Sequence, residues 1–224
     1  KTSEFPIHIR ESFLKIEKTV RINLCKGENC IIDMGKITGS SVVIKNEAFG
    51  AYVLTAGHVC DTSDRMIPNM ENIQGVEIVI EALDLQMNRY YSEIVNIDME
   101  LDTCLLFVFD LRGKVAPISD TNPVPGDKVY NVAAPVGVFY EGVVPLLDGY
   151  FTGVRNQDGA ALYTVPAAGG SSGSPIFNHD GELVGMIHSV NRYFPMITVS
   201  PTLPQLRRFI TNSIILHKRK NRKQ

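Results

Sequence analysis

The sequence predicts an all-β protein of two antiparallel β units with a short helix at each end. Short β-rich runs, separated by Gly, Pro, Asn and Asp, recur along the chain as they do in barrels and sandwiches. A stretch interrupted by proline and glycine, residues 113–128, divides them into two sets of similar size. Of the 224 residues, 44% are hydrophobic and 21% charged, which excludes a disordered, collagen-like or disulfide-dense chain.

Six segments are predicted from this pattern. In chain order they are an N-terminal helical segment (1–20), a first β unit (21–112), a linker (113–128), a second β unit (129–200), a C-terminal helix (201–217) and a basic tail (218–224). The clearest β-rich runs are residues 20–24, 41–45, 51–55, 76–82 and 105–109 before the linker, and 129–133, 150–154, 161–165, 182–189 and 196–199 after it.

Both helices are predicted from hydrophobic periodicity. Near the N-terminus, apolar residues recur at intervals of four, three and four with charged residues between them, at Ile9, Phe13, Ile16 and Val20. Past Pro201, one apolar face is formed by Leu203, Leu206, Ile210 and Ile214. Thr202 and Gln205 fit a capping box at the start of this second helix.

The charge is concentrated at the C-terminus. The formal net charge is -2, but five of the 22 basic residues lie within residues 218–224, which leaves 17 against 24 acidic residues in the rest. This balance argues against a surface that binds nucleic acid throughout, and confines attraction to a partner, nucleic acid or anionic surface to the tail. A solvated terminus is the plainer reading of the tail.

No apolar run reaches the roughly 18 to 20 residues that cross a bilayer, so no transmembrane segment is expected. Because the first residue is Lys1 rather than Met, a removed leader segment is neither shown nor denied. The compartment and the oligomeric state cannot be read from the sequence.

Four cysteines do not make a disulfide framework at this length. Cys25 and Cys30 flank a turn-like tetrapeptide, so they could face each other across a hairpin and form a bond. Cys60 and Cys104 are expected to be small buried hydrophobic residues. A second short Cys or His pair is missing, and P-loop, dinucleotide and metalloprotease motifs are absent too, so no metal or cofactor is expected.

Three segments hold the candidate chemistry. His58 follows an apolar strand and two small residues, and Asp102 opens another apolar strand. Each alone could be structural, as a satisfied histidine or a solvated strand-end carboxylate. The third segment, residues 169–174, places serines among glycines, whose backbone N–H groups can approach a developing oxyanion. A serine nucleophile needs a base and the base needs a carboxylate, and the three segments supply all three groups.

In these motifs the sequence resembles the chymotrypsin-like serine peptidases, especially the bacterial and phage branch near the high-temperature-requirement peptidases. The matching motifs are Thr-Ala-Gly-His (55–58), Asp-Thr-Cys-Leu-Leu (102–106) and Gly-Ser-Ser-Gly-Ser-Pro (170–175), in the family's order. The resemblance spans about residues 20–200. It implies two six-stranded antiparallel barrels with the active site between them, and a polypeptide substrate. The protein is expected to be soluble, with its localisation left open between secreted, periplasmic, and phage- or virus-associated. No PDZ domain occurs in these 224 residues.

The resemblance also implies the residue roles of a serine endopeptidase. Ser172 would attack the peptide carbonyl, His58 would act as base and then as acid, and Asp102 would orient the imidazole. The backbone N–H groups of Gly170 and Ser172 would form the oxyanion hole. The alternative class is a catalytically weak or latent module that uses the protease fold for binding or as a chaperone.

Several positions depart from the family's pattern. Ser171 replaces the aspartate that pairs with a new N-terminus in digestive trypsins, so activation by N-terminal cleavage is not expected. Cys60 lies near the family's half-cystine, but no cysteine occurs around residues 39–43, so that disulfide is expected to be absent. The same loop also reads as a G-x-S-x-G elbow with Ser171 as the nucleophile, although Pro175 argues against the helix that must follow an elbow.

The resemblance places the substrate pocket at Pro166, for its floor, and at His188, Ser189 and Val190, for one wall. No acidic residue stands at the floor, which argues against cleavage after Lys or Arg. Val190 would narrow the pocket toward small or medium apolar side chains. His188 could line the pocket and accept an acidic or amide side chain, or simply pack behind Asp102, which is the favoured reading.

Overall fold

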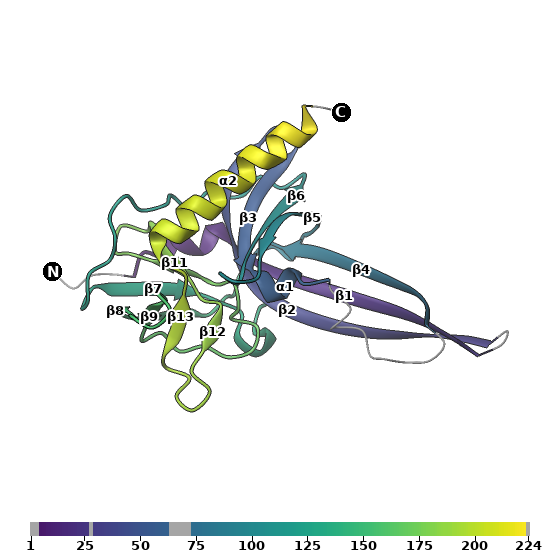
Figure 1. The fold of residues 1–224 in the computed structure, drawn as a ribbon, viewed down its shortest axis with the longest axis horizontal. Helices are drawn as coiled ribbons and strands as arrows, with labels where there is room; N and C mark the ends of the chain where they lie inside the picture. The colour runs from purple at the N-terminus through teal and green to yellow at the C-terminus, as the bar shows by residue number, and fades with distance from the viewer. Residues whose placement is uncertain (1–4, 27–28, 63–72, 223–224) are drawn as a thin grey trace.

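The computed structural model describes residues 5–26, 29–62 and 73–222. They form two antiparallel sheets, with a short 3-10 helix before the first and a long α-helix after the second (Figure 1). The predicted all-β class and the division into two antiparallel β units are confirmed.

The first sheet is a closed barrel with strand order β1-β2-β3-β6-β5-β4. Its strands are β1 (Phe13–Lys26), β2 (Asn29–Glu47), β3 (Gly50–Ala56), β4 (Ile73–Leu83), β5 (Arg89–Asp98) and β6 (Thr103–Phe109). A one-turn helix, α1 (Gly57–Cys60), follows β3. Strand β5 is absent from the β-rich runs predicted above, because its charged and polar residues hide the apolar ones.

Three strands of the barrel continue outward as an arm. The far halves of β1, β2 and β4 lie side by side and project from the molecule (Figure 1). Cys25 and Cys30 are paired in the β1–β2 register near the end of this arm, and their sulfur atoms are bonded. The hairpin therefore places these two cysteines as the sequence allowed.

The second sheet is open and has seven strands, in the order β11-β10-β7-β8-β9-β13-β12, rather than the expected six in a closed barrel. The strands are β7 (Lys128–Val132), β8 (Leu146–Val154), β9 (Ala161–Tyr163), β10 (Pro175–Phe177), β11 (Leu183–Met186), β12 (Ser189–Val190) and β13 (Thr198–Ser200). A short 3-10 helix, η3 (Pro135–Gly137), follows β7. Phe151, Tyr163 and Ile176 lie in the core of this half-barrel.

The N-terminal helix is shorter than the periodicity predicts. A 3-10 helix, η1, covers only Ile7–Ser12, and β1 begins at Phe13. Every residue from Phe13 to Val20 is buried, including the charged residues assigned to a solvent-facing helix surface. Lys15, for example, pairs with Glu17 at 2.9 Å. The helical prediction for residues 13–20 is therefore wrong, because burial of both faces removed the alternation that marks a strand.

The chain between Phe109 and Lys128 contains no strand of either sheet; its Ile118 makes one isolated bridge to Leu183. After the second sheet, helix α2 (Leu203–Asn221) packs on β5, β6 and β11 (Figure 1). At its start, the Thr202 backbone N–H donates to the Gln205 side chain at 2.8 Å, as in a capping box.

Helix α2 also includes the first four residues of the predicted basic tail. The Lys218 ammonium lies 2.7 Å from a carboxylate oxygen of Glu47 on β2, and the His217 imidazole lies 2.9 Å from the Tyr52 hydroxyl. Residues 218–221 are thus helical rather than frayed, although they are exposed to solvent as predicted. Residues 223 and 224 lie outside the described ranges. Within those ranges, no helix is both long and apolar enough to cross a membrane.

Candidate active site

His58 lies on α1, at the point where β3 leaves the barrel. Its side chain is 44% exposed, whereas its neighbours Gly57 and Val59 are buried. A Cβ on Gly57 would lie 2.9 Å from a carboxylate oxygen of Asp102, so the lack of a side chain there lets the carboxylate approach. The small residues before the histidine therefore serve a close contact between two segments.

Asp102 occupies the turn between β5 and β6, with a left-handed backbone (φ 49°) that non-glycine residues seldom adopt. Its Oδ1 accepts a hydrogen bond from the His58 backbone N–H at 2.7 Å, and its Oδ2 lies 2.8 Å from His58 Nδ1. The carboxylate thus fixes both the backbone and the ring of His58. A hydrogen bond at Nδ1 orients the ring and leaves Nε2 available for proton transfer.

The charge of Asp102 is stabilised in the folded protein. Burial alone would raise the pKa of this carboxyl group, but the His188 imidazole and the ring and backbone N–H of His58 outweigh burial and hold the pKa well below its ordinary value. The His188 contact is long, 3.6 Å from Nδ1 to Oδ2, compared with 2.8 Å for the His58 contact with the same oxygen. Asp102 is therefore an anion at neutral pH.

A disulfide between Cys60 and Cys104 ties the histidine segment to the aspartate segment. Both cysteines are buried as predicted, but they are bonded to each other rather than free. The family's disulfide between Cys60 and residues 39–43 is absent, as expected, because no cysteine occurs there. The β3–β6 register sets Cys104 opposite Thr55, at the end of the strand that leads into α1. Each half-cystine lies two residues after a candidate catalytic side chain.

The loop with the third candidate, Ser172, docks against the first barrel. Its backbone carbonyl accepts a hydrogen bond from the Ser40 N–H of β2 at 2.8 Å. The next residue, Gly173, has φ +87°, and a Cβ there would lie 2.1 Å from the Ser40 carbonyl oxygen and 2.3 Å from the Thr55 hydroxyl oxygen. Glycine is required at this position, since it lets the loop lie against the end of β3, close to α1.

Of the three serines in this loop, only Ser172 is accessible. Ser171 is 1% exposed and its hydroxyl oxygen accepts a hydrogen bond from the Ala168 N–H, while Ser174 is fully buried and accepts one from the Asn131 side chain. A nucleophile must reach its substrate, so burial disfavours Ser171. Strand β10 rather than a helix follows the loop, which is also contrary to the elbow reading.

The backbone of the loop presents two candidate oxyanion donors. The carbonyl groups of Gly169, Gly170 and Ser171 accept hydrogen bonds from Val136, Ser40 and Ser174 respectively. Within the described ranges, the N–H groups of Gly170 and Ser172 donate to no acceptor. They are therefore available to an oxygen atom of a ligand.

The hydroxyl group of Ser172 makes no hydrogen bond to His58, or to any other described residue. His58 thus contacts Asp102 directly, and the Ser172 loop lies at the same end of the barrel. The hydrogen bond between Ser172 and His58 is not formed. Such contacts are often long in a ligand-free site and shorten when substrate binds.

The candidate pocket residues lie on two neighbouring segments. Pro166 is partly buried, and its successor Ala167 donates a backbone hydrogen bond to the Pro195 carbonyl at 3.0 Å. Ser189 and Val190 form β12, the exposed edge strand of the second sheet. His188, one residue earlier, points to Asp102, as in the reading that packs it behind the carboxylate.

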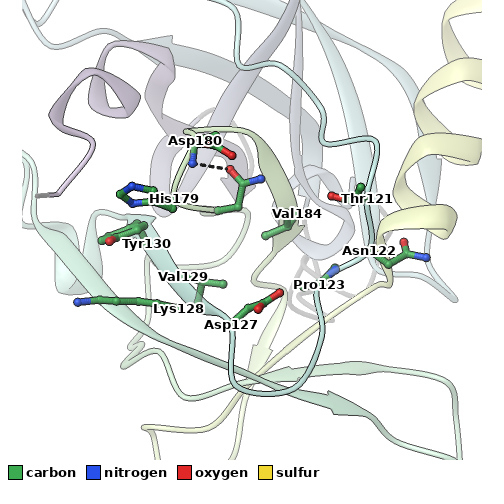
Figure 2. A pocket seen from close by; sticks show the side chains of 11 residues that line it. Thr121, Asn122, Pro123, Asp127, Lys128, Val129, Tyr130, His179, Asp180 and Val184 are labelled. Carbon is green, nitrogen blue, oxygen red and sulfur yellow. Dashed lines mark hydrogen bonds between the residues drawn. The ribbon is translucent and has the colours of Figure 1, made fainter. Parts of the chain in front are cut away.

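Two cavities differ in their relation to this site. The one in Figure 2, of about 310 Å³, lies between the start of β7 and the β10–β11 turn, and none of its lining residues is a candidate above. Tyr130 and His179 lie together on one side of it, with their ring centroids 6.4 Å apart. A second cavity, of about 170 Å³, is lined by the candidates His188 and Ser189 together with Leu101, the neighbour of Asp102. No group of three His, Cys, Asp or Glu side chains suited to a metal ion occurs in the described part of the chain.

Sequence reasoning missed two residues that contact the segments of the candidate site. The Ser40 hydroxyl donates to the Gly170 carbonyl at 2.8 Å and accepts from the Ala134 N–H at 3.0 Å, so it joins three segments. Its place in the Gly-Ser-Ser run of residues 39–41 was the available signal. The second is Lys18 beneath α1, for which the sequence offers no local pattern.

Comparison with known proteins decides the family. A family model described as "Trypsin-like peptidase domain" matches residues 39–186, about two thirds of the chain. The chain belongs to the trypsin-like peptidase family. This match confirms the predicted resemblance. The matched range begins beside Ser40 and includes His58, Asp102 and Ser172.

Solved structures agree on the fold. An inactive serine-to-alanine mutant of Rv3671c from M. tuberculosis H37Rv superposes with a TM-score of 0.65 at 13% identity, covering 92% of this chain and 88% of that one. A serine endoprotease from Yersinia pestis has a TM-score of 0.63 at 19% identity, covering 88% of this chain and 62% of that one. No curated protein sequence is significantly similar to this chain. At these identities the structural likeness concerns the fold alone.

Proposed function

We propose that this protein is a serine endopeptidase that uses Ser172, His58 and Asp102 as its catalytic triad. The observation that supports it most is the double contact of Asp102 with the backbone and ring of His58, at 2.7 and 2.8 Å, beside a glycine-rich loop with a single accessible serine. A structural carboxylate–histidine pair would not require the exposed ring edge that His58 keeps.

In the proposed reaction, Ser172 Oγ attacks the carbonyl carbon of the scissile peptide bond while its proton passes to His58 Nε2. The negative charge that develops on the carbonyl oxygen is stabilised by the N–H groups of Gly170 and Ser172. His58 then gives the proton to the leaving amine and the C–N bond breaks, which leaves an acyl-Ser172 ester. Water, deprotonated by His58, hydrolyses this ester and releases the second product. Asp102 stays ionised throughout and stabilises the imidazolium.

On the substrate side, we propose that the chain to be cleaved lies along edge strand β12, with the side chain before the cut in a pocket between Pro166 and Val190. Val190 is 37% exposed and lies on this edge. Small or medium apolar side chains are the proposed preference. His188 is assigned to Asp102 rather than to this pocket, because its ring nitrogen faces the carboxylate.

Labelling with a fluorophosphonate tests the proposal, since the probe needs an activated serine and a formed oxyanion hole. We expect labelling of wild-type protein at Ser172, located by peptide mapping, and no labelling of Ser172→Ala. His58→Ala should lower the labelling rate and peptide turnover by about 10⁶-fold. The control Ser171→Ala should label at the wild-type rate. Labelling at Ser171 would refute the assignment.

The absence of a Ser172–His58 hydrogen bond is the one observation that fits the second candidate, a latent binding module. A folded wild-type protein that resists the probe and cleaves no peptide from a diverse library would favour that module. Labelling with peptide turnover would exclude it.

A further inference from the structure

Lys18 is a lysine with no exposed surface, directly beneath the helix that holds His58. It lies on β1, and its Nζ donates to the backbone carbonyl of Asp61 at 2.7 Å and lies 3.5 Å from the backbone carbonyl of His58. His58 is the second of the four residues of α1, and Asp61 is the residue just after the helix. The ammonium group thus reaches two acceptors that a helix end leaves without intrahelical partners.

The position of Lys18 in the strand is otherwise apolar. Side chains alternate between the two faces of β1, and the face that contains Lys18 also contains Leu14, Ile16, Val20 and Ile22, all of them buried. An apolar side chain would suit this face without a desolvation cost. Burial lowers the pKa of the Lys18 ammonium group, partly opposed by the charge of Asp61. The lysine therefore costs stability unless its contacts with the carbonyl groups return it.

Helix α1 depends on outside contacts. Four residues make only one turn, too short to be stable alone. Asp102 accepts a hydrogen bond from the His58 N–H, and the disulfide links Cys60 to β6. Lys18 Nζ lies 3.5 Å from the carbonyl oxygen of the same His58. The backbone N–H of the histidine is thus contacted by the β5–β6 turn, and its C=O by strand β1.

We propose that Lys18 is a positioning residue for His58, holding the backbone of α1 so that the imidazole stays against Asp102 and aimed at the Ser172 loop. The inference rests on the proposed function for its effect on turnover, but not for its effect on the ring of His58. Removal of the amino group takes this donor away from both carbonyl groups, and the backbone of α1 should shift in response.

Lys18→Met is the test variant, since methionine keeps the length and loses the donor. The matched control is Lys15→Met, on the same strand, which removes a buried ammonium group that pairs with Glu17 instead. Lys18→Met should lower kcat by about 10- to 100-fold with KM unchanged, the usual effect of a small misplacement of a catalytic group. Lys15→Met should lower the free energy of unfolding and leave kcat unchanged. Lys18→Gln keeps a shorter donor and should restore part of kcat.

An activity-independent readout separates this inference from the proposed function. In a Ser172→Ala background, the NMR resonances of the His58 ring should shift in Lys18→Met and not in Lys15→Met. A protein without turnover would refute the endopeptidase and leave this comparison valid. Unchanged His58 resonances in folded Lys18→Met, or equal changes in both variants, would overturn the positioning role.

If Lys18→Met does not fold, Lys18→Gln in the Ser172→Ala background provides the test. Its shorter side chain should move the His58 ring resonances from their wild-type positions, while Lys15→Gln should leave them in place. Unchanged His58 resonances in folded Lys18→Gln, or equal changes in the two glutamine variants, would overturn the inference.

Discussion

Removal of the Cys60–Cys104 disulfide should cost both stability and reactivity, and the size of the first effect follows from the chain. The two half-cystines are 44 residues apart, and closing a loop of that length in the unfolded chain corresponds to about 4 kcal/mol of stability at 25 °C. The Cys25–Cys30 bond closes a loop of only five residues and corresponds to about 2 kcal/mol. The second bond is therefore a matched control.

The assay measures the urea unfolding of Cys60→Ala/Cys104→Ala and of Cys25→Ala/Cys30→Ala, monitored by circular dichroism. Since Cys60 and Cys104 are fully buried, their truncation adds a cavity term. Chemical reduction of Cys25→Ala/Cys30→Ala avoids this term, because it breaks only the Cys60–Cys104 bond. The first variant should also react more slowly with the fluorophosphonate, because the bond ties α1 to β6 beside both His58 and Asp102. The second should react at the wild-type rate, since its bond lies on the arm.

Equal losses of unfolding free energy in the two variants would refute the loop-closure argument. A first variant that keeps the wild-type labelling rate would refute the view that this disulfide holds the candidate site, whatever its stability.

Two further predictions concern the site. Because the pKa of Asp102 is lowered in the folded protein, its contribution to stability is complete above the unfolded pKa and is lost as the pH falls below about 4. Acid should thus reduce the unfolding free energy of the wild type more steeply than that of Asp102→Asn, and this variant should lose about 10⁴-fold in kcat at neutral pH; parallel acid titrations of unfolding would contradict this. Gly173→Ala should abolish labelling and destabilise the protein by more than the roughly 1–2 kcal/mol of a left-handed backbone, because its Cβ would overlap the Ser40 carbonyl. Gly126→Ala, also at positive φ but in open space, should lose only that backbone cost and keep its labelling, and equal losses in the two would contradict the steric argument.

The sequence predicts those parts of the site that are encoded in short, contiguous motifs. His58, Asp102 and the Ser172 loop each stand in a short run that joins a strand end to a functional side chain, and these runs suffice to propose three roles. The order of the three motifs along the chain indicates the family, and the resemblance to that family implies an arrangement of two barrels. None of these steps requires knowledge of which strands are neighbours.

The Cys60–Cys104 pair shows what a local reading misses. No sequence motif relates two cysteines that lie 44 residues apart. Their pairing depends on the β3–β6 register, which sets Thr55 opposite Cys104. The error over β1 has a related cause. Its residues 13–20 are buried on both faces, so charged side chains stand where a surface reading expects solvent, and the apolar ones happen to recur at helical intervals.

The first barrel holds both sides of the candidate catalytic pair. His58 is fixed by Asp102, Lys18 and the Cys60 disulfide, all from that barrel or its turns. The nucleophile loop comes from the second sheet, yet Ser40 of β2 binds it twice, through the carbonyl groups of Ser172 and Gly170. A rigid shift of the second sheet would have to break these two bonds before it could separate Ser172 from His58. The alignment of base and nucleophile therefore depends directly on β2, one strand of the first barrel.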